Sequence, residues 1–462
     1  MDAGHFREAA ALYRELVQAL PDNPGLRLDL GLALHSEGSY REAVVQFQAA
    51  VRRQPDLEPG WLMLGLSYRK LAEPGSAVEP LERALRINPA DQKAQLELAD
   101  AYLSVGRLEE ASREFKAITE SESANAKGWQ GLGLSYAALS RITFGRLEKT
   151  NPSSPYHDAL LAQSMRARGQ DRSAFYWYKQ AIAKESDLPG VHAALAQIYR
   201  DSGHPDWASI EKDRERQESR PDCRREPLEC DYLEGHLSQV LRAANGDDRP
   251  ETLYWKAQAY EQLSAQALAH LAAMPETAEI HELLAEAHVM KGDYHGAVKE
   301  WRAGLKLAPG DGLLTEGLAH ALWLDNQYSE AKQFLGQLVQ SNPGSAEIHF
   351  ELGDTLLATG STDKAIPQLE QAVKLEPTLA PAQASLGRAY LRAGRPKDAI
   401  PALKAALPGD EKGAARYQLA QAYRQTGQKA LADETLREFQ QNSAAALERS
   451  TEMDREQEIT AP

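Results

Sequence analysis

The sequence predicts an all-α fold, a right-handed solenoid built from stacked pairs of helices. One observation is a spacing of 34 residues, which Pro21, Pro55 and Pro89 follow near the N-terminus. The same spacing runs through the C-terminal half as Leu284, Leu318, Leu352 and Leu386. A fixed period of this length is typical of repeat proteins, whose units bury their apolar faces only by stacking on their neighbours.

A single unit, residues 24–57, shows why each repeat is expected to be a pair of helices. Leu30, Leu34 and the small Gly31 share one helical face. Gly38 can adopt the positive φ of a tight turn. A second helix follows, with side chains at steps of three and four: Tyr40, Ala43, Phe47 and Ala50. Pro55 ends that helix before the next unit begins.

These units resemble the tetratricopeptide repeat. WLMLGLSY at 61–68 and WQGLGLSY at 129–136 match the first helix of that repeat. GSYREAVVQFQAA at 38–50 and GDYHGAVKEWRAG at 292–304 match its second helix. The resemblance covers most of the chain and implies roughly a dozen helix-turn-helix units.

Departures from the pattern divide the predicted solenoid into two blocks. Residues 1–219 are expected to form an N-terminal array, and residues 251–442 a C-terminal array. Between them, residues 220–250 form a charged break that contains both cysteines and a short helix pair. Residues 443–462 are expected to form a capping helix and a loose tail.

Two places fit the repeat poorly. After Tyr136 the expected second helix is the short, off-pattern segment SRITFGRLEKTNP. The chain also begins with a second helix, whose inner face is expected to carry Phe6, Tyr13 and Leu16. A bare apolar face is unfavourable, so we expect either an earlier start of the chain or a cover from a partner or a second copy.

Composition and motifs argue against several functions. The formal net charge of -15 disfavours nucleic acid as a partner, and an acidic surface also avoids anionic membranes. No apolar run approaches the length of a membrane span, so no membrane insertion is expected. HELLAEAH at 281–288 lacks the metalloprotease spacing of its histidines. We therefore expect no enzyme, no cofactor and no metal.

The cysteines Cys223 and Cys230 leave three interpretations open. A disulfide would close a short loop beside Pro227 and would indicate an oxidising, exported location. A zinc site would need further ligands, for which His236 is the nearby imidazole. Two reduced thiols would fit a cytoplasmic protein.

The resemblance implies a concave groove lined by the first helix of each unit, at the second, fifth, ninth and twelfth positions. Mapped onto this chain, the groove is apolar, then basic and polar, then acidic, then basic. The candidate residues are Leu28, Leu32, Leu62, Leu66, Arg69, Leu96, Gln163, Arg166, Gln197, Arg200, Glu279, Glu282, Glu286, Glu316, His320, Trp323, Arg388, Leu391, Tyr417 and Arg424. Such patterning suits a protein or an extended peptide better than a small molecule.

Two functions follow from these expectations. The favoured one is a non-enzymatic scaffold that binds protein or peptide partners along its groove, in a multiprotein assembly. The alternative is the regulatory or substrate-recognition arm of an enzyme whose catalytic part lies outside this chain. Neither the partner nor the oligomeric state follows from the sequence.

Overall fold

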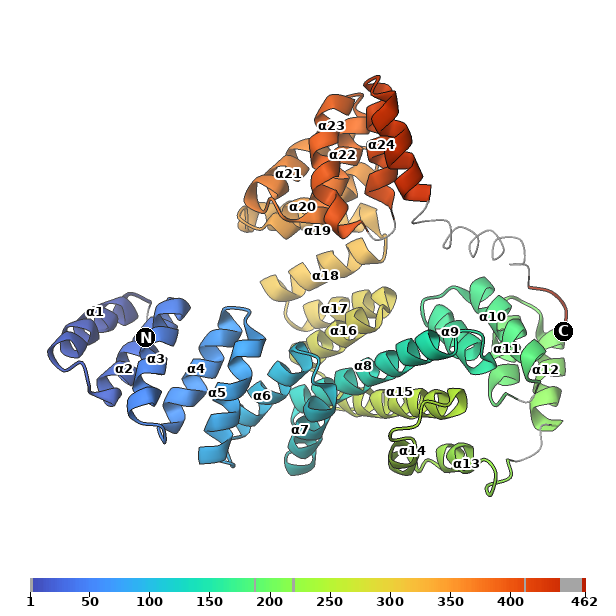
Figure 1. Ribbon diagram of the computed structural model, residues 1–462, viewed down its shortest axis with the longest axis horizontal. Helices are drawn as coiled ribbons and strands as arrows, with labels where there is room; N and C mark the ends of the chain where they lie inside the picture. The colour runs from blue at the N-terminus through green and yellow to red at the C-terminus, as the bar shows by residue number, and fades with distance from the viewer. Residues whose placement is uncertain (1–2, 187, 218–220, 411–412, 441–458) are drawn as a thin grey trace. The chain divides into compact units, whose positions relative to one another are not determined.

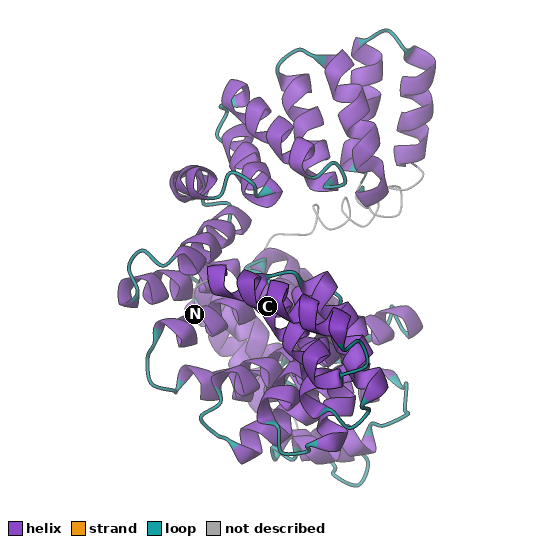
Figure 2. Ribbon diagram, turned by 90° about the vertical axis from the view of Figure 1, so that its left-hand side faces the viewer, coloured by secondary structure: helices purple, strands orange, loops and turns teal. Residues whose placement is uncertain are grey.

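The computed structural model describes residues 3–186, 188–217, 221–410, 413–440 and 459–462. Throughout these ranges the regular structure is helical, without a strand, as Figure 2 shows. The predicted all-α solenoid is therefore confirmed. The contacts between helices divide the chain into two units, residues 1–150 with 221–275 and residues 151–220 with 276–462. Each unit is interrupted in sequence, and the block boundaries predicted at 219 and 250 stay a prediction.

The first unit holds the N-terminal helices and three later ones (Figure 1). Its helices are α1 Ala3–Ala19, α2 Pro24–Glu37, α3 Tyr40–Arg53, α4 Glu58–Lys70, α5 Pro74–Ile87, α6 Gln92–Ser104, α7 Leu108–Ser121, α8 Ala126–Thr150, α13 Pro227–Leu233, α14 Leu237–Ala243 and α15 Pro250–Ala272.

The second unit holds the remaining helices. They are α9 Pro155–Ala167, α10 Asp171–Lys184, α11 Val191–Asp201, α12 Pro205–Gln217, α16 Ala278–Lys291, α17 Tyr294–Leu307, α18 Gly312–Leu324, α19 Tyr328–Ser341, α20 Ala346–Ala358, α21 Thr362–Leu375, α22 Ala380–Arg392, α23 Pro396–Ala406 and α24 Ala414–Gln425. A short 3-10 turn, Leu407–Gly409, follows α23.

Small residues let the two helices of a unit approach closely. A Cβ atom added to Gly31 in α2 would lie 2.5 Å from the Phe47 ring in α3, closer than real contacts allow. Phe47 is fully buried by this approach. At the turn between the same helices, Gly38 has a φ of 90°, which side chains rarely tolerate. The sequence thus specifies both the contact and the turn.

The same contact recurs sixteen residues along the chain in other units. Gly65 lies against Leu81, Gly353 against Leu369, and Gly387 against Leu403. In the second unit, buried apolar residues form one continuous core that runs from Ala285 in α16 to Ala432, beyond α24. Stacking therefore buries the apolar faces that no single helix pair could bury.

One repeat departs from this rule, at the segment 140–152, where the sequence predicted a separate second helix. That segment is not a second helix, because residues 126–150 form a single helix of 25 residues, α8. Its Gly133 would bring a Cβ atom within 2.8 Å of Leu268, which lies in α15. The first helix of this repeat therefore finds its second helix more than a hundred residues further along the chain.

Helices α8 and α15 lie side by side and antiparallel (Figure 1). Trp129 stacks on His270 with ring centroids 4.0 Å apart, at the start of α8 and the end of α15. At the opposite end, Arg146 Nη2 lies 2.6 Å from Asp248 Oδ2. Everything between Thr150 and Asp248 is thus inserted into one repeat.

Helix α1 packs on α2 through part of the expected face. Tyr13 packs against the core, together with Val17 and the fully buried Ala10. Leu16, which the sequence placed on a face without a cover in this chain, is 46% exposed.

Candidate partner-binding groove

In the second unit, the first helices of three successive repeats, α16, α18 and α20, enclose an open groove of about 580 Å³. One residue of the second helix α17, Trp301, and one of α19, Leu338, close its base. The other lining residues are Glu282, Glu286, Leu313, Glu316, Gly317, His320, Trp323, Glu347, Ile348, Phe350, Glu351 and Leu379. The lining thus combines apolar and acidic side chains.

Aromatic rings make one wall of the groove. Trp323 of α18 meets Phe350 of α20 edge to face, with centroids 5.4 Å apart. His320, one turn before Trp323, lies 5.7 Å from the tryptophan ring. Gly317 lies close against the ring of Trp301, so this ring reaches the groove from the layer beneath. Fixed aromatic rings offer large contact area at little entropic cost.

The glutamates of the groove come from all three first helices. Glu351 is 8% exposed, and its Oε1 lies 2.5 Å from Nδ1 of His320. This hydrogen bond raises the pKa of His320, burial opposes the shift, and the charges of Glu351, Glu347 and Glu316 add to it. Unlike Glu351, Glu347 and Glu316 are exposed. The groove therefore presents a field of negative charge in which one imidazole favours its cationic form.

Asp354 of α20 connects Trp323 of the groove to α22. Its Oδ2 accepts a hydrogen bond of 3.2 Å from Nε1 of Trp323 and so fixes the indole plane. Its Oδ1 accepts from Ser385 Oγ at 2.8 Å and also pairs with Arg388. Arg388 thus balances the charge of Asp354, and the negatively charged surface of the groove does not extend to α22.

Five of the sequence candidates line this groove: Glu282, Glu286, Glu316, His320 and Trp323. Glu279 is exposed on α16 outside the lining. Other lining residues were not predicted from the sequence, among them Trp301, Glu347, Phe350 and Glu351. Glu347 and Phe350 occupy the second and fifth positions of their repeat, so the same rule applied to α20 would have found them.

The N-terminal candidates occupy a different surface. Leu28, Leu32, Leu62 and Leu66 are half-buried on α2 and α4. Arg69 places Nη1 2.6 Å from Glu97 and 3.0 Å from Asp100, both on α6. Leu96 packs against the neighbouring core. Here a cation already balances the carboxylates of the next first helix.

The candidates on α9, α11, α22 and α24 are separate from the acidic groove. Gln197 Nε2 donates to Asp201 at 2.7 Å, and Gln197 Oε1 accepts from Arg200. Arg166 lies 3.5 Å from Asp201. Gln163 is half-buried on α9. Tyr417 is exposed and packs on Phe439, Arg424 is exposed, and Leu391 packs against the core. The role of these residues stays a prediction.

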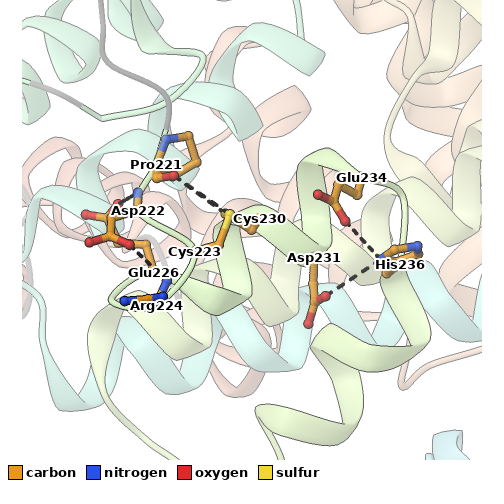
Figure 3. The surroundings of a disulfide bond; sticks show 9 residues. All are labelled: Pro221, Asp222, Cys223, Arg224, Glu226, Cys230, Asp231, Glu234 and His236. Carbon is orange, nitrogen blue, oxygen red and sulfur yellow. Dashed lines mark hydrogen bonds and ion pairs between the residues drawn. A yellow bond between two sulfur atoms is a disulfide. The ribbon is translucent and has the colours of Figure 1, made fainter.

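The structure joins Cys223 and Cys230 by a disulfide, with Cα atoms 5.6 Å apart (Figure 3). The bond holds the turn before α13 to the helix itself. His236 lies beside Asp231 and Glu234 instead of the sulfurs, at 3.7 and 3.4 Å (Figure 3). Across the described ranges, no group of three or more histidine, cysteine, aspartate or glutamate side chains could hold a metal ion.

Among the helices of the described residues, none is both long and apolar enough to cross a bilayer.

Stacked helix pairs with a lined groove define a helical-repeat protein. A tetratricopeptide repeat model matches residues 1–64, 71–133, 322–386 and 356–422, and a second tetratricopeptide repeat model matches residues 414–444. Together these matches cover more than half of the chain. The protein belongs to the tetratricopeptide repeat family.

Solved structures with related folds include MamA, at 24% identity, covering 38% of this chain and 96% of that chain with a TM-score of 0.32. MamA from Desulfovibrio magneticus RS-1 is 20% identical, and the match covers 37% of this chain and 98% of that chain with a TM-score of 0.34. YrrB, described as a TPR protein with an unusual peptide-binding site, is 21% identical, and the match covers 40% of this chain and 80% of that chain with a TM-score of 0.28. Scores at this level support no inference about function. No curated protein matches the chain.

Proposed function

We propose that this protein is a non-enzymatic scaffold that binds a segment of a partner protein in the groove of α16, α18 and α20. The observation that carries the proposal is the lining of this groove. Aromatic rings and glutamates from successive first helices converge on one open volume of about 580 Å³. Concave sites with fixed apolar walls and a few polar groups are the usual sites of recognition.

The shape and chemistry of the groove favour an extended chain as ligand. Three successive first helices line the groove, so an extended ligand can meet each of them in turn. Apolar surface dominates the base, through Trp301, Leu338 and Ile348, all buried. Carboxylates supply the orienting contacts.

The disulfide supports a further part of the proposal, an oxidising compartment, because disulfides persist there and are rare in the reducing cytosol. Alkylation of protein from its source cells, before and after reduction, measures the state of both cysteines. Labelling only after reduction is expected. Labelling before reduction would place the protein in a reducing compartment.

Selection of peptides from a random display library on the full chain tests the binding function. Bound peptides are then titrated against Trp323→Ala, which removes a wall of the groove, and against Tyr417→Ala, which removes an exposed tyrosine elsewhere. We expect Trp323→Ala to weaken binding about a hundredfold, as for a central aromatic anchor, and Tyr417→Ala to have no effect. Peptides that bind equally well to both variants would overturn the proposed site.

A further inference from the structure

We propose that the groove of α16, α18 and α20 recognises a cationic segment, an extended chain that places a lysine or arginine side chain between the aromatic wall and the glutamates. This inference rests on the proposed function and names the chemistry of the partner. Three independent features of the groove lead to it: the sign of its charge, its aromatic wall, and a buried donor.

The charge of the lining has one sign. Five of the lining residues are glutamates, and neither a lysine nor an arginine is among them. Glu316 on α18 and Glu347 on α20 are exposed, and no ion pair of either is found in the part of the chain that the structure describes. His320 is engaged by Glu351. A cationic side chain gains from this field, and an anionic one is repelled.

The aromatic wall suits the same side chain. Lysine and arginine carry an apolar stem behind the charged head, and the stem can lie on an aromatic surface while the head reaches the carboxylates. The faces of Trp and Phe also attract cations directly. Trp323 and Phe350 stand edge to face beside Glu316, Glu347 and Glu351, so both contacts are available at one place.

A buried donor points to a peptide in preference to a small cation. Trp301 lines the groove and is 6% exposed, and its Nε1–H has no acceptor among the described residues. By contrast, the indole N–H groups of Trp61 and Trp129 each donate 2.9 Å bonds to backbone carbonyls. An extended chain brings carbonyl oxygens that can satisfy such a donor, whereas a metal ion or a polyamine brings none.

Two other sets of carboxylates on first helices are balanced by arginines, unlike Glu316 and Glu347 within the described residues. Glu97 and Asp100 meet Arg69, and Asp354 meets Arg388. A second copy of this chain is a poor occupant, because its formal net charge is -15. The complementary partner is a basic segment of another protein.

The test uses peptides selected on the full chain and measures their affinity by fluorescence anisotropy. Lysine and arginine are expected to be enriched in the selected peptides. The double variant Glu316→Gln with Glu347→Gln is expected to weaken binding about tenfold, and added salt to weaken it further. Glu279→Gln is the matched control, because Glu279 is exposed on α16 but does not line the groove.

A second variant separates the effect of charge in the groove from an effect on folding. Leu313 lines the groove and is 70% exposed, so Leu313→Lys adds a positive charge without disturbing the core. It is expected to weaken binding of basic peptides, with circular dichroism and melting temperature unchanged.

Two outcomes separate this inference from the proposed function. Peptides that need Trp323 but lack basic residues, and bind the glutamine variants unchanged, would overturn the inference and leave the scaffold function standing. If no selected peptide depends on Trp323, the proposed site fails and the inference fails with it.

Discussion

The first helices of the two units share a packing plan but differ in what they expose. Arg69 in α4 and Trp323 in α18 are equivalent, since each is the twelfth residue of its helix. Arg69 pairs with Glu97 and Asp100 on the next first helix. Trp323 instead donates a neutral hydrogen bond to Asp354. The equivalent carboxylates on α20 are engaged by other side chains, Glu351 by His320 and Asp354 by Arg388, so the twelfth position can carry an aromatic ring that lines the groove.

This comparison separates folding from recognition. Gly65 lies against Leu81 in the first unit, and Gly353 against Leu369 in the second, with nearly identical approach. The side chains that hold the helices together are therefore shared, and the side chains that face the groove are free to vary. That separation is what allows one repeat to serve different partners.

The largest expected effect comes from making the second unit resemble the first. Trp323→Arg removes the aromatic wall and places a cation beside Glu351 and Asp354. Binding of a basic peptide is expected to fall about a hundredfold, because an anchor is lost and a repulsive charge is added. Anisotropy titration measures the change. Arg69→Trp, the reverse substitution, is the control, and an equal loss from it would erase the distinction between the two regions.

The shared packing predicts equal losses of stability in both units. Gly65→Ala and Gly353→Ala each force a Cβ atom against a buried leucine, at 2.6 Å before relaxation. Each is expected to cost about 1–3 kcal/mol in the free energy of unfolding, measured by urea denaturation.

A glycine without a close neighbour is expected to have the opposite effect on the free energy of unfolding when it is replaced by alanine. Gly336 lies inside α19 with open space around its Cα, so Gly336→Ala is expected to stabilise by about 0.5–1 kcal/mol. A loss at Gly336 as large as at Gly353 would show that helix contacts do not explain the pattern.

The interrupted repeat predicts that the stabilities of α8 and α15 are coupled, although the two helices are far apart in the sequence. Leu268→Ala removes the side chain that lies against Gly133 and is expected to cost about 2 kcal/mol. Hydrogen exchange measured by mass spectrometry should then speed up in α8 as well as in α15. Faster exchange confined to α15 would show that the two helices do not form one unit.

The smallest effect is a pH dependence at His320. The hydrogen bond to Glu351 raises the pKa of this imidazole above its ordinary value of 6.5. The stabilisation is therefore complete below the unfolded pKa and is lost as pH rises through the folded pKa. Urea denaturation at pH 6 and pH 9 measures the difference between wild type and His320→Gln. A wild-type chain that gains stability relative to the variant at high pH would contradict the assignment.

The fold could be predicted from the sequence because the packing pattern repeats every 34 residues, and each unit carries its own glycine contact, turn and apolar face. The interrupted repeat could not be predicted, because the helix that packs on α8 lies far along the chain. One local signal was present: sixteen residues after Gly133 stands Lys149, where other units carry Phe47, Leu81 or Leu369. A charged residue cannot fill that contact, so a second helix from elsewhere was required.

The candidate site was predicted in part for a related reason. Repeat positions identified five residues of first helices that line the groove: Glu282, Glu286, Glu316, His320 and Trp323. Trp301 reaches the groove from a second helix only because Gly317 leaves room for its ring. Such a contact depends on stacking geometry, which no single repeat reveals.

Photocrosslinking of a selected peptide to the full chain tests the central claim most directly. A benzophenone-bearing peptide is bound, irradiated, and its attachment sites are read by mass spectrometry. The account predicts attachment within Ala278–Lys291, Gly312–Leu324 and Ala346–Ala358, the three helices that enclose the acidic groove. Attachment to Pro24–Glu37, Glu58–Lys70 and Gln92–Ser104 instead would contradict it and place binding on the charge-balanced face of the first unit.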